Sequence, residues 1–200
     1  MPRTLTASDR KSLIRLASTL PVGSPERKAI LAGLSRVAGR RWKSIADAQK
    51  DYARFAAQGH KMIAALERSA KSYERADGYK GDPKKKKPAI EKCASTFFKM
   101  LDAVENFAGK VRQAYEDGVF SDETPALGTF QLGDIVDGSA RSWFSGWRRR
   151  ADDMLASSNK TFMISPSEFL AGERGSYESY PEWFGKLFDS IEDAERILDK

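Results

Sequence analysis

Cys93 and His60, the single cysteine and the single histidine of the chain, are the first residues whose chemistry has to be weighed. Both fall in stretches that we expect to form facing helices, where a thiol and an imidazole could make a nucleophilic pair. However, no nucleophile motif surrounds Cys93, which lies one helical step from a stripe of apolar residues. A free cysteine beside a core usually packs as a small apolar side chain. The sequence therefore favours a structural role for Cys93.

Neighbouring carboxylates occur at Asp152 and Asp153 and within residues 192–195. Catalytic acids need burial or converging partners, whereas these residues are expected on charged helix faces near bases, so solvated faces explain them better. One His and one Cys are too few for an ordinary structural zinc site. Neither a phosphate-binding glycine loop nor a calcium-loop spacing is present. We therefore predict that the protein is not an enzyme and uses no cofactor or metal.

The positive charge of the chain is concentrated at its beginning. Residues 1–43 hold ten Lys and Arg residues and two acidic residues, a local charge of +8, whereas the whole chain carries +6. Attraction to nucleic acid, an anionic membrane or an acidic partner should therefore be strongest there. The residues expected to contact such a partner are Arg10, Lys11, Arg15, Arg27, Lys28, Arg36, Arg40 and Arg41.

Two further basic clusters are candidate nucleic-acid contacts. Four consecutive lysines stand between Pro83 and Pro88, where they could bind phosphates, although a solvated loop tip explains them better. Three arginines follow Trp143 and Trp147, a composition suited to stacking bases, although the two tryptophans equally form a ridge of the core. The residues of the two clusters are Lys84, Lys85, Lys86, Lys87, Arg148, Arg149 and Arg150.

Residues 1–41 are predicted to form a basic arm of two short helices separated by a Pro-Val-Gly turn. Helices this short must fold against something else. Their layout is superficially that of a DNA-reading helix pair, but the turn contains proline and no third helix of matching size follows. Non-specific contact with phosphates is a second alternative. The basic, acid-poor composition also suits an organelle transit peptide, which would place the protein in an organelle matrix.

Three pieces of this arm carry a resemblance: Leu-Ile-Arg-Leu-Ala, Leu-Pro-Val-Gly-Ser and Glu-Arg-Lys-Ala-Ile-Leu-Ala. Together, residues 10–34 resemble a short basic helical module of uncharacterised and virion-associated proteins of large tailed bacteriophages. The resemblance covers about 25 of the 200 residues. It implies a viral context, and it carries over no activity and no catalytic residue.

A long antiparallel helical hairpin is predicted for residues 42–118. Apolar residues recur every seven positions over residues 45–73, and an apolar stripe at alternating four- and three-residue steps covers residues 90–115. We place the helices at about residues 42–77 and 88–117, with residues 78–88 as the turn. Gly59, at a core-facing position, predicts the close approach of a ring, which Phe97, Phe98 or Phe107 could supply.

Smaller elements are expected towards the C-terminus. Residues 129–136 and 161–164 are compatible with short strands, while residues 139–157, residues 165–172 and the stretch from Pro181 onwards show helical spacing. The fold class is therefore mainly α, with at most a minor two-stranded β patch. We expect the basic arm over residues 1–41 and a helical domain over residues 42–200, whose smaller helices lie within residues 139–200.

These features favour a non-catalytic structural or interaction protein, a component of a bacteriophage virion whose basic arm contacts a neighbouring subunit or nucleic acid. A protein partner or self-assembly is expected. The alternative is a nucleic-acid-binding protein that uses the arm and the Lys and Arg clusters. No stretch approaches the roughly 18 apolar residues of a membrane span, and the single cysteine fits a reducing compartment, either the virion or the host cytoplasm.

Overall fold

The computed structural model describes residues 16, 26, 30, 41–128, 130–160, 163–172 and 178–198. The chain divides into two compact units, Met1–Arg41 and Trp42–Lys200. In the first unit, the described residues Leu16, Glu26 and Ile30 are helical. The rest of the predicted two-helix arm lies outside the described residues, so its layout stays a prediction.

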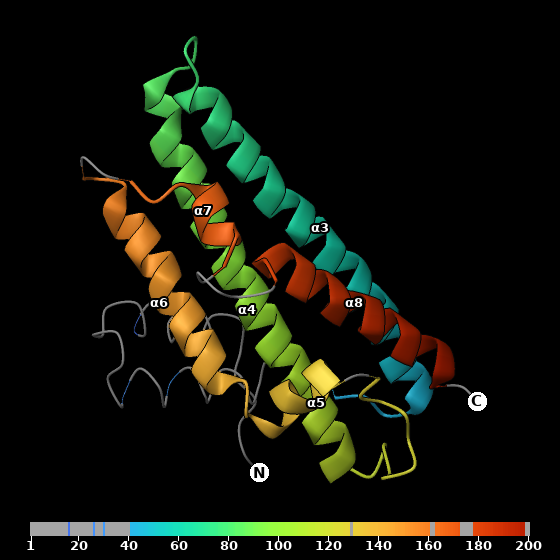
Figure 1. Cartoon of the computed structure of the whole chain (residues 1–200). Coiled ribbons are helices and arrows are strands. Elements are labelled where there is room, and N and C mark those ends of the chain that lie inside the picture. Colours follow the sequence, from blue (N-terminus) through green and yellow to red (C-terminus); the bar gives the residue numbers. More distant parts are fainter. Residues whose placement is uncertain are drawn as a thin grey trace. The chain divides into compact units, whose positions relative to one another are not determined.

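The second unit is helical, and no strand occurs among the residues described there, which confirms the mainly α fold predicted from the sequence. Figure 1 shows two long helices, α3 and α4, with the shorter helices packed against them. The elements are α3 (Ile45–Asp77), the 3₁₀ helix η1 (Pro83–Lys85), α4 (Lys86–Glu116), α5 (Phe130–Asp137), α6 (Arg141–Ser157), α7 (Pro166–Leu170) and α8 (Tyr180–Ile197).

The turn between α3 and α4 is shorter than predicted, because helical structure resumes at Pro83. Asp82 accepts a hydrogen bond from the backbone N–H of Lys84 and so caps η1. Pro88 is the third residue of α4, where its missing N–H would have had no partner within the helix. The predicted loop conformation of these lysines was therefore wrong, because their backbone is helical, whereas their predicted solvation is confirmed for Lys84, Lys85 and Lys87, which are exposed.

Helices α3 and α4 pack side by side, and their inner faces carry the buried residues of the predicted periodic patterns. On that inner side α8 packs along α3, and α6 packs along α4. Phe55 of α3, Phe107 of α4 and Phe188 of α8 meet where the three helices converge: the first two rings stack with centroids 4.2 Å apart. The α3–α4 pair therefore has one face inside the core and one face that the shorter helices leave uncovered.

The first predicted strand is a helix. Residues 129–136 were expected to be extended, but Phe130–Asp137 forms α5. Its buried side chains Leu132, Ile135 and Val136 follow at helical steps of three and four, which a run this short does not distinguish from alternation. Of the second predicted strand, residues 161 and 162 lie outside the described residues, and Met163 and Ile164 are not in a strand.

Serine caps begin the last two helices. Ser165 and Glu168 form a capping box at α7, and Ser179 and Glu182 form another at α8, each followed by proline in the first turn. Within the described ranges, none of the helices combines the length and the apolar character that crossing a membrane requires.

Candidate functional site

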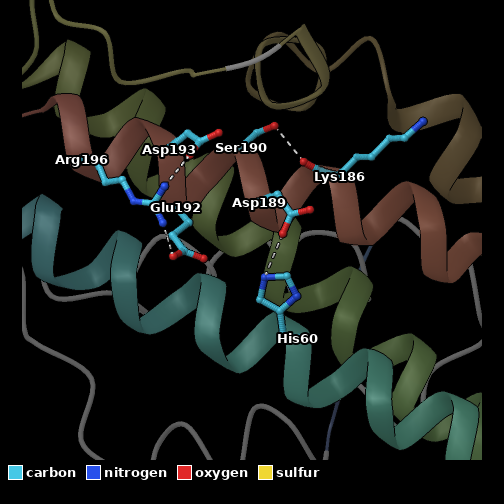
Figure 2. Close-up of polar contacts among 7 residues, drawn as sticks. All are labelled: His60, Lys186, Asp189, Ser190, Glu192, Asp193 and Arg196. Atoms are coloured by element: carbon cyan, nitrogen blue, oxygen red, sulfur yellow. Dashed lines mark hydrogen bonds and ion pairs between the residues drawn. The ribbon is translucent and has the colours of Figure 1, made fainter.

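Cys93 and His60 lie in different environments in the structure and do not form a pair. Cys93 is fully buried in α4, and burial raises the pKa of its thiol to about 12, so the thiol is protonated at neutral pH. The imidazole of His60 instead faces α8, where Nε2 lies 3.4 Å from Oδ1 of Asp189, as Figure 2 shows. No hydrogen bond joins Cys93 to His60 among the described residues.

The carboxylate groups considered from the sequence lie on helix surfaces. Asp152 and Asp153 are exposed on α6, and the pKa of Asp152 is raised, first by partial burial and then by the neighbouring charge of Asp153. At the end of α8, Arg196 pairs with both Glu192 and Asp193 (Figure 2). Among the described residues, no three His, Cys, Asp or Glu side chains converge to hold a metal ion.

Of the eight basic residues proposed in the N-terminal arm, seven lie outside the described residues. The eighth, Arg41, is exposed. The seven undescribed residues are Arg10, Lys11, Arg15, Arg27, Lys28, Arg36 and Arg40.

Two lysines of the Lys84–Lys87 cluster are engaged within the fold. Lys86 pairs with Asp77 at the end of α3 and lies over the ring of Tyr73, and Lys87 Nζ donates a hydrogen bond to Asn159 Oδ1 at 3.0 Å. Lys84 and Lys85 are exposed. Two of the four lysines therefore remain open to a partner.

The arginine cluster on α6 likewise contains residues with partners inside the fold and a residue that is exposed. Arg148 pairs with Asp102 and Glu105 of α4, at 2.7 and 2.9 Å. Arg150 donates a hydrogen bond to the carbonyl oxygen of Gly172 and lies over the ring of Tyr180. Arg149 is exposed. Two of the three arginines therefore hold α6 to its neighbours, and the cluster as a whole is not a free basic patch.

A larger basic surface lies on the outer face of the α3–α4 pair. Helix α3 carries bases at seven-residue steps, and a second row with the same step begins just before α4 and runs along it. All six side chains are exposed. We call this surface the basic ladder, and its members are Lys61, Arg68 and Arg75 on the first row and Lys85, Lys92 and Lys99 on the second.

Core contacts fix which bases face one another. Near one end of the pair, Lys110 Nζ of α4 donates to Asp51 Oδ2 of α3 at 2.8 Å, and the ring of Phe107 contacts the ring of Tyr52. At the other end, Lys86 lies over Tyr73.

In the register set by these contacts, the antiparallel rows match in pairs. Lys61 lies opposite Lys99, Arg68 opposite Lys92, and Arg75 opposite Lys85. Successive pairs are about 10 Å apart, because seven residues of helix rise by that amount.

No hydrogen bond or ion pair with another described residue neutralises the six side chains of the ladder. Three acids, Glu67, Glu74 and Glu91, each precede a ladder residue by one position, which turns them by about 100° around their helices. Successive pairs, about 10 Å apart, lie just beyond the Debye length of about 8 Å at physiological salt, so their repulsion is largely screened there and is stronger at low salt. This arrangement stabilises nothing in the isolated chain, and a bound polyanion would relieve the repulsion.

Part of the ladder lines a pocket of about 450 Å³ at the turn end of the pair. Arg68 and Ser72 come from α3, while Lys85, Pro88 and Lys92 come from the start of the second row. Direct lining of one pocket by Arg68, Lys85 and Lys92 agrees with the register deduced from the core. The pocket offers three cationic groups to a single anionic ligand, whereas the hydroxyl of Ser72 already donates to the carbonyl oxygen of Arg68.

At the end of the α3–α4 pair away from the turn, the charged residues are paired with one another. Asp51 receives hydrogen bonds from Lys110 and from the indole of Trp42, and Arg54 pairs with it. Burial raises the pKa of Asp51, but the hydrogen bonds from Lys110 and Trp42 outweigh burial and leave the pKa below its ordinary value. The uncompensated positive charge therefore lies in the middle and at the turn end.

Of the six ladder residues, only Lys85 was predicted from the sequence, because the prediction relied on runs of consecutive charges and not on the spacing between single bases. The signal that could have found them is their period: the bases recur at the same seven-residue step as the core residues, which keeps them on one face. Comparison of the chain with protein-family models, with curated proteins and with solved structures finds no match.

Proposed function

We propose that the protein is a non-catalytic nucleic-acid-binding protein that holds a sugar–phosphate backbone along the basic ladder. The observation that carries the proposal is the pairing of two rows of exposed bases across the outer face of α3 and α4, without carboxylate partners among the described residues. Clustered Lys and Arg bind nucleic acid by neutralising phosphates and releasing condensed counterions. The elongated, unpaired arrangement suits a linear polyanion better than a small ligand.

The chemistry of the face favours nucleic acid over a membrane surface. A helix that binds a bilayer places large apolar side chains beside its bases, so that they enter the interface. Around the ladder, the outward positions of α3 are instead taken by small residues such as Ala57, Ala64 and Ser72. Among the described residues, the large exposed apolar side chains Leu16, Trp143, Ile164 and Ile197 belong to other elements, and the fifth, Tyr79, lies in the turn that follows α3 and not on the ladder.

The non-catalytic part of the proposal is supported by the surroundings of the two most reactive side chains. Cys93 is buried with a raised pKa, and the His60 imidazole faces Asp189 on an exposed helix edge. Catalytic groups are usually found in a cleft that a substrate can enter, whereas Cys93 is enclosed in the core and His60 lies at a partly exposed position of α3.

A structural role in a bacteriophage particle remains our proposal for the context in which this binding occurs. A virion component that lies against packaged nucleic acid needs contacts to the phosphate backbone that do not depend on sequence. The ladder supplies such contacts in the second unit, and the basic N-terminal arm adds charge in the first. Genes for capsid, portal or tail proteins beside the gene for this chain would support the virion context, and a neighbourhood without them would count against it.

Fluorescence anisotropy with labelled DNA tests the binding proposal. We expect the full chain to bind at 50 mM salt and to lose affinity steeply as salt is raised. Replacing Arg68, Arg75 and Lys92 together by Gln should weaken binding roughly tenfold or more and lower the slope of log K against log salt by about 2 to 3.

The matched control replaces Arg141, Arg149 and Lys160 by Gln, which removes the same number of Arg and Lys residues from exposed positions on or just after α6. Equal weakening by both triple variants would show that net charge, and not the ladder, drives binding. A third variant, with Gln at Arg27, Lys28 and Arg36, measures the share of the N-terminal arm. Absence of binding by the unaltered chain at 50 mM salt would rule the proposal out.

A further inference from the structure

The turn between α3 and α4 carries a feature that phosphate binding does not use. Tyr79 lies at the apex, and its side chain is fully exposed to solvent. It is flanked by Lys80 and is followed by Lys84 and Lys85, all of which are exposed. An aromatic ring surrounded by lysines is the combination that proteins use to stack a base while holding the adjoining phosphates.

The backbone of the turn that carries Tyr79 packs against the end of α3 and is held by a hydrogen bond and an ion pair. A Cβ built on Gly81 would overlap the carbonyl oxygens of Arg75 and Ala76, which means that the turn packs directly on the end of α3. The N–H of Gly81 donates to the carbonyl oxygen of Gly78 at 2.7 Å. The ion pair between Lys86 and Asp77 closes the turn from the other side.

The charged pocket lies at the same end of the helix pair. Lys85 belongs both to the lysines that follow the turn and to the pocket lining, where it joins Arg68 and Lys92. A strand whose phosphates occupy the pocket and the ladder would therefore bring its next nucleotide to the turn. The turn that carries Tyr79 therefore adjoins the end of the ladder in sequence, so that the ladder could hold the backbone of a strand while the ring meets its terminal base.

We propose that Tyr79 stacks on an unpaired base, so that the protein binds single-stranded nucleic acid, or the single-stranded end of a duplex, in preference to a continuous duplex. This inference rests on the proposed function, because the ladder must first hold the strand. A duplex offers its phosphates to the ladder, but its base faces are already covered by neighbouring bases. Only an unpaired nucleotide can use both parts of the surface.

Anisotropy with a labelled single-stranded 20-mer and with the corresponding duplex tests the inference in the full chain. We expect tighter binding of the single strand, and Tyr79→Ala should weaken it by about five- to a hundredfold while leaving the duplex affinity unchanged. Tyr79→Phe should retain the preference, because the ring is kept. Ile197→Ala, which removes another exposed large apolar side chain, is the control and should leave both affinities unchanged.

A 2-aminopurine placed in the single strand supplies an independent readout, since stacking on Tyr79 should quench its fluorescence and Tyr79→Ala should restore it. The melting temperature of Tyr79→Ala should equal that of the unaltered chain, because the side chain makes no buried contact. Equal affinity for both nucleic acids, or equal weakening of both by Tyr79→Ala, would overturn the inference. If the triple Gln variant of the ladder also left both affinities unchanged, the proposed function would be wrong as well as the inference about Tyr79.

Discussion

Gly59 of α3 lies directly against the ring of Phe188 of α8: a Cβ built on Gly59 would overlap Cγ and two further carbon atoms of that ring. The glycine is buried at this point, and Phe188 also packs edge-to-face on Phe55 of α3, with ring centroids 5.5 Å apart. The missing side chain of Gly59 is therefore what allows α8 to approach α3 closely enough to cover the inner face of the helix pair.

Replacing Gly59 by Ala should destabilise the protein. Alanine improves helix propensity by about 1 kcal/mol, but forcing a methyl group against a buried ring typically costs about 1 to 3 kcal/mol, and α8 must shift to accommodate it. We expect a net loss of stability in urea unfolding. Gly109→Ala is the control, because Gly109 is an exposed residue of α4 whose added Cβ would meet no atom within 4 Å. That variant should gain stability.

The close approach at Gly59 was predictable from the sequence, but the identity of the ring was not. Seven-residue periodicity shows which side of α3 is buried and that bulky side chains meet it. It does not show which later helix supplies them, and the choice of Phe97, Phe98 or Phe107 from the neighbouring helix was wrong. The ring belongs to α8, whose packing on α3 depends on tertiary contacts that no local pattern encodes.

For the basic residues too, the sequence predicted some features and not others. The runs of lysine and arginine were predicted as contacts because of their density, but Lys86, Arg148 and Arg150 are held by partners within the fold. Those partners come from α3, from α4 and from the segment after α7, and a local charge pattern does not reveal them. The short segment that forms α5 was predicted as a strand because eight residues fit both periods. Long periodic segments could therefore be predicted, and pairings between distant elements could not.

Leu101 and Lys85 should respond in opposite ways to an introduced acid. Leu101 is fully buried in α4, so Leu101→Asp places a carboxylate in the core without a partner and should unfold the protein. Lys85 is exposed beside other bases, so Lys85→Glu should leave the melting temperature nearly unchanged. Circular dichroism melts of both variants check the prediction. A large drop for Lys85→Glu would mean that this residue makes a stabilising contact.

Cys93 should be unreactive in the folded protein. Its thiol is buried, and burial raises its pKa to about 12, so the reactive thiolate is scarce at pH 8. A thiol-specific dye should label the native protein only as fast as the protein unfolds, and labelling should be immediate in concentrated guanidinium chloride. Rapid labelling under native conditions, with unchanged circular dichroism, would contradict the packing of α4 described above.

Asp51 should make the stability of the helix pair depend on pH in the acid range. Burial opposes ionisation of Asp51, but the hydrogen bonds from Lys110 and Trp42 outweigh it, and the pKa in the folded protein lies below the ordinary value of 3.8. The carboxylate therefore stabilises the fold fully above the pKa of the unfolded chain, and this contribution is lost as pH falls through the folded pKa. We expect Asp51→Asn to lower the free energy of unfolding at pH 6, and the gap to the unaltered chain to shrink below about pH 4. Asp137→Asn, which changes an exposed acid at the end of α5, should follow the unaltered chain at both pH values. A gap for Asp51→Asn that stays constant down to pH 2.5 would show that the loss comes from altered packing and not from the ionised carboxylate.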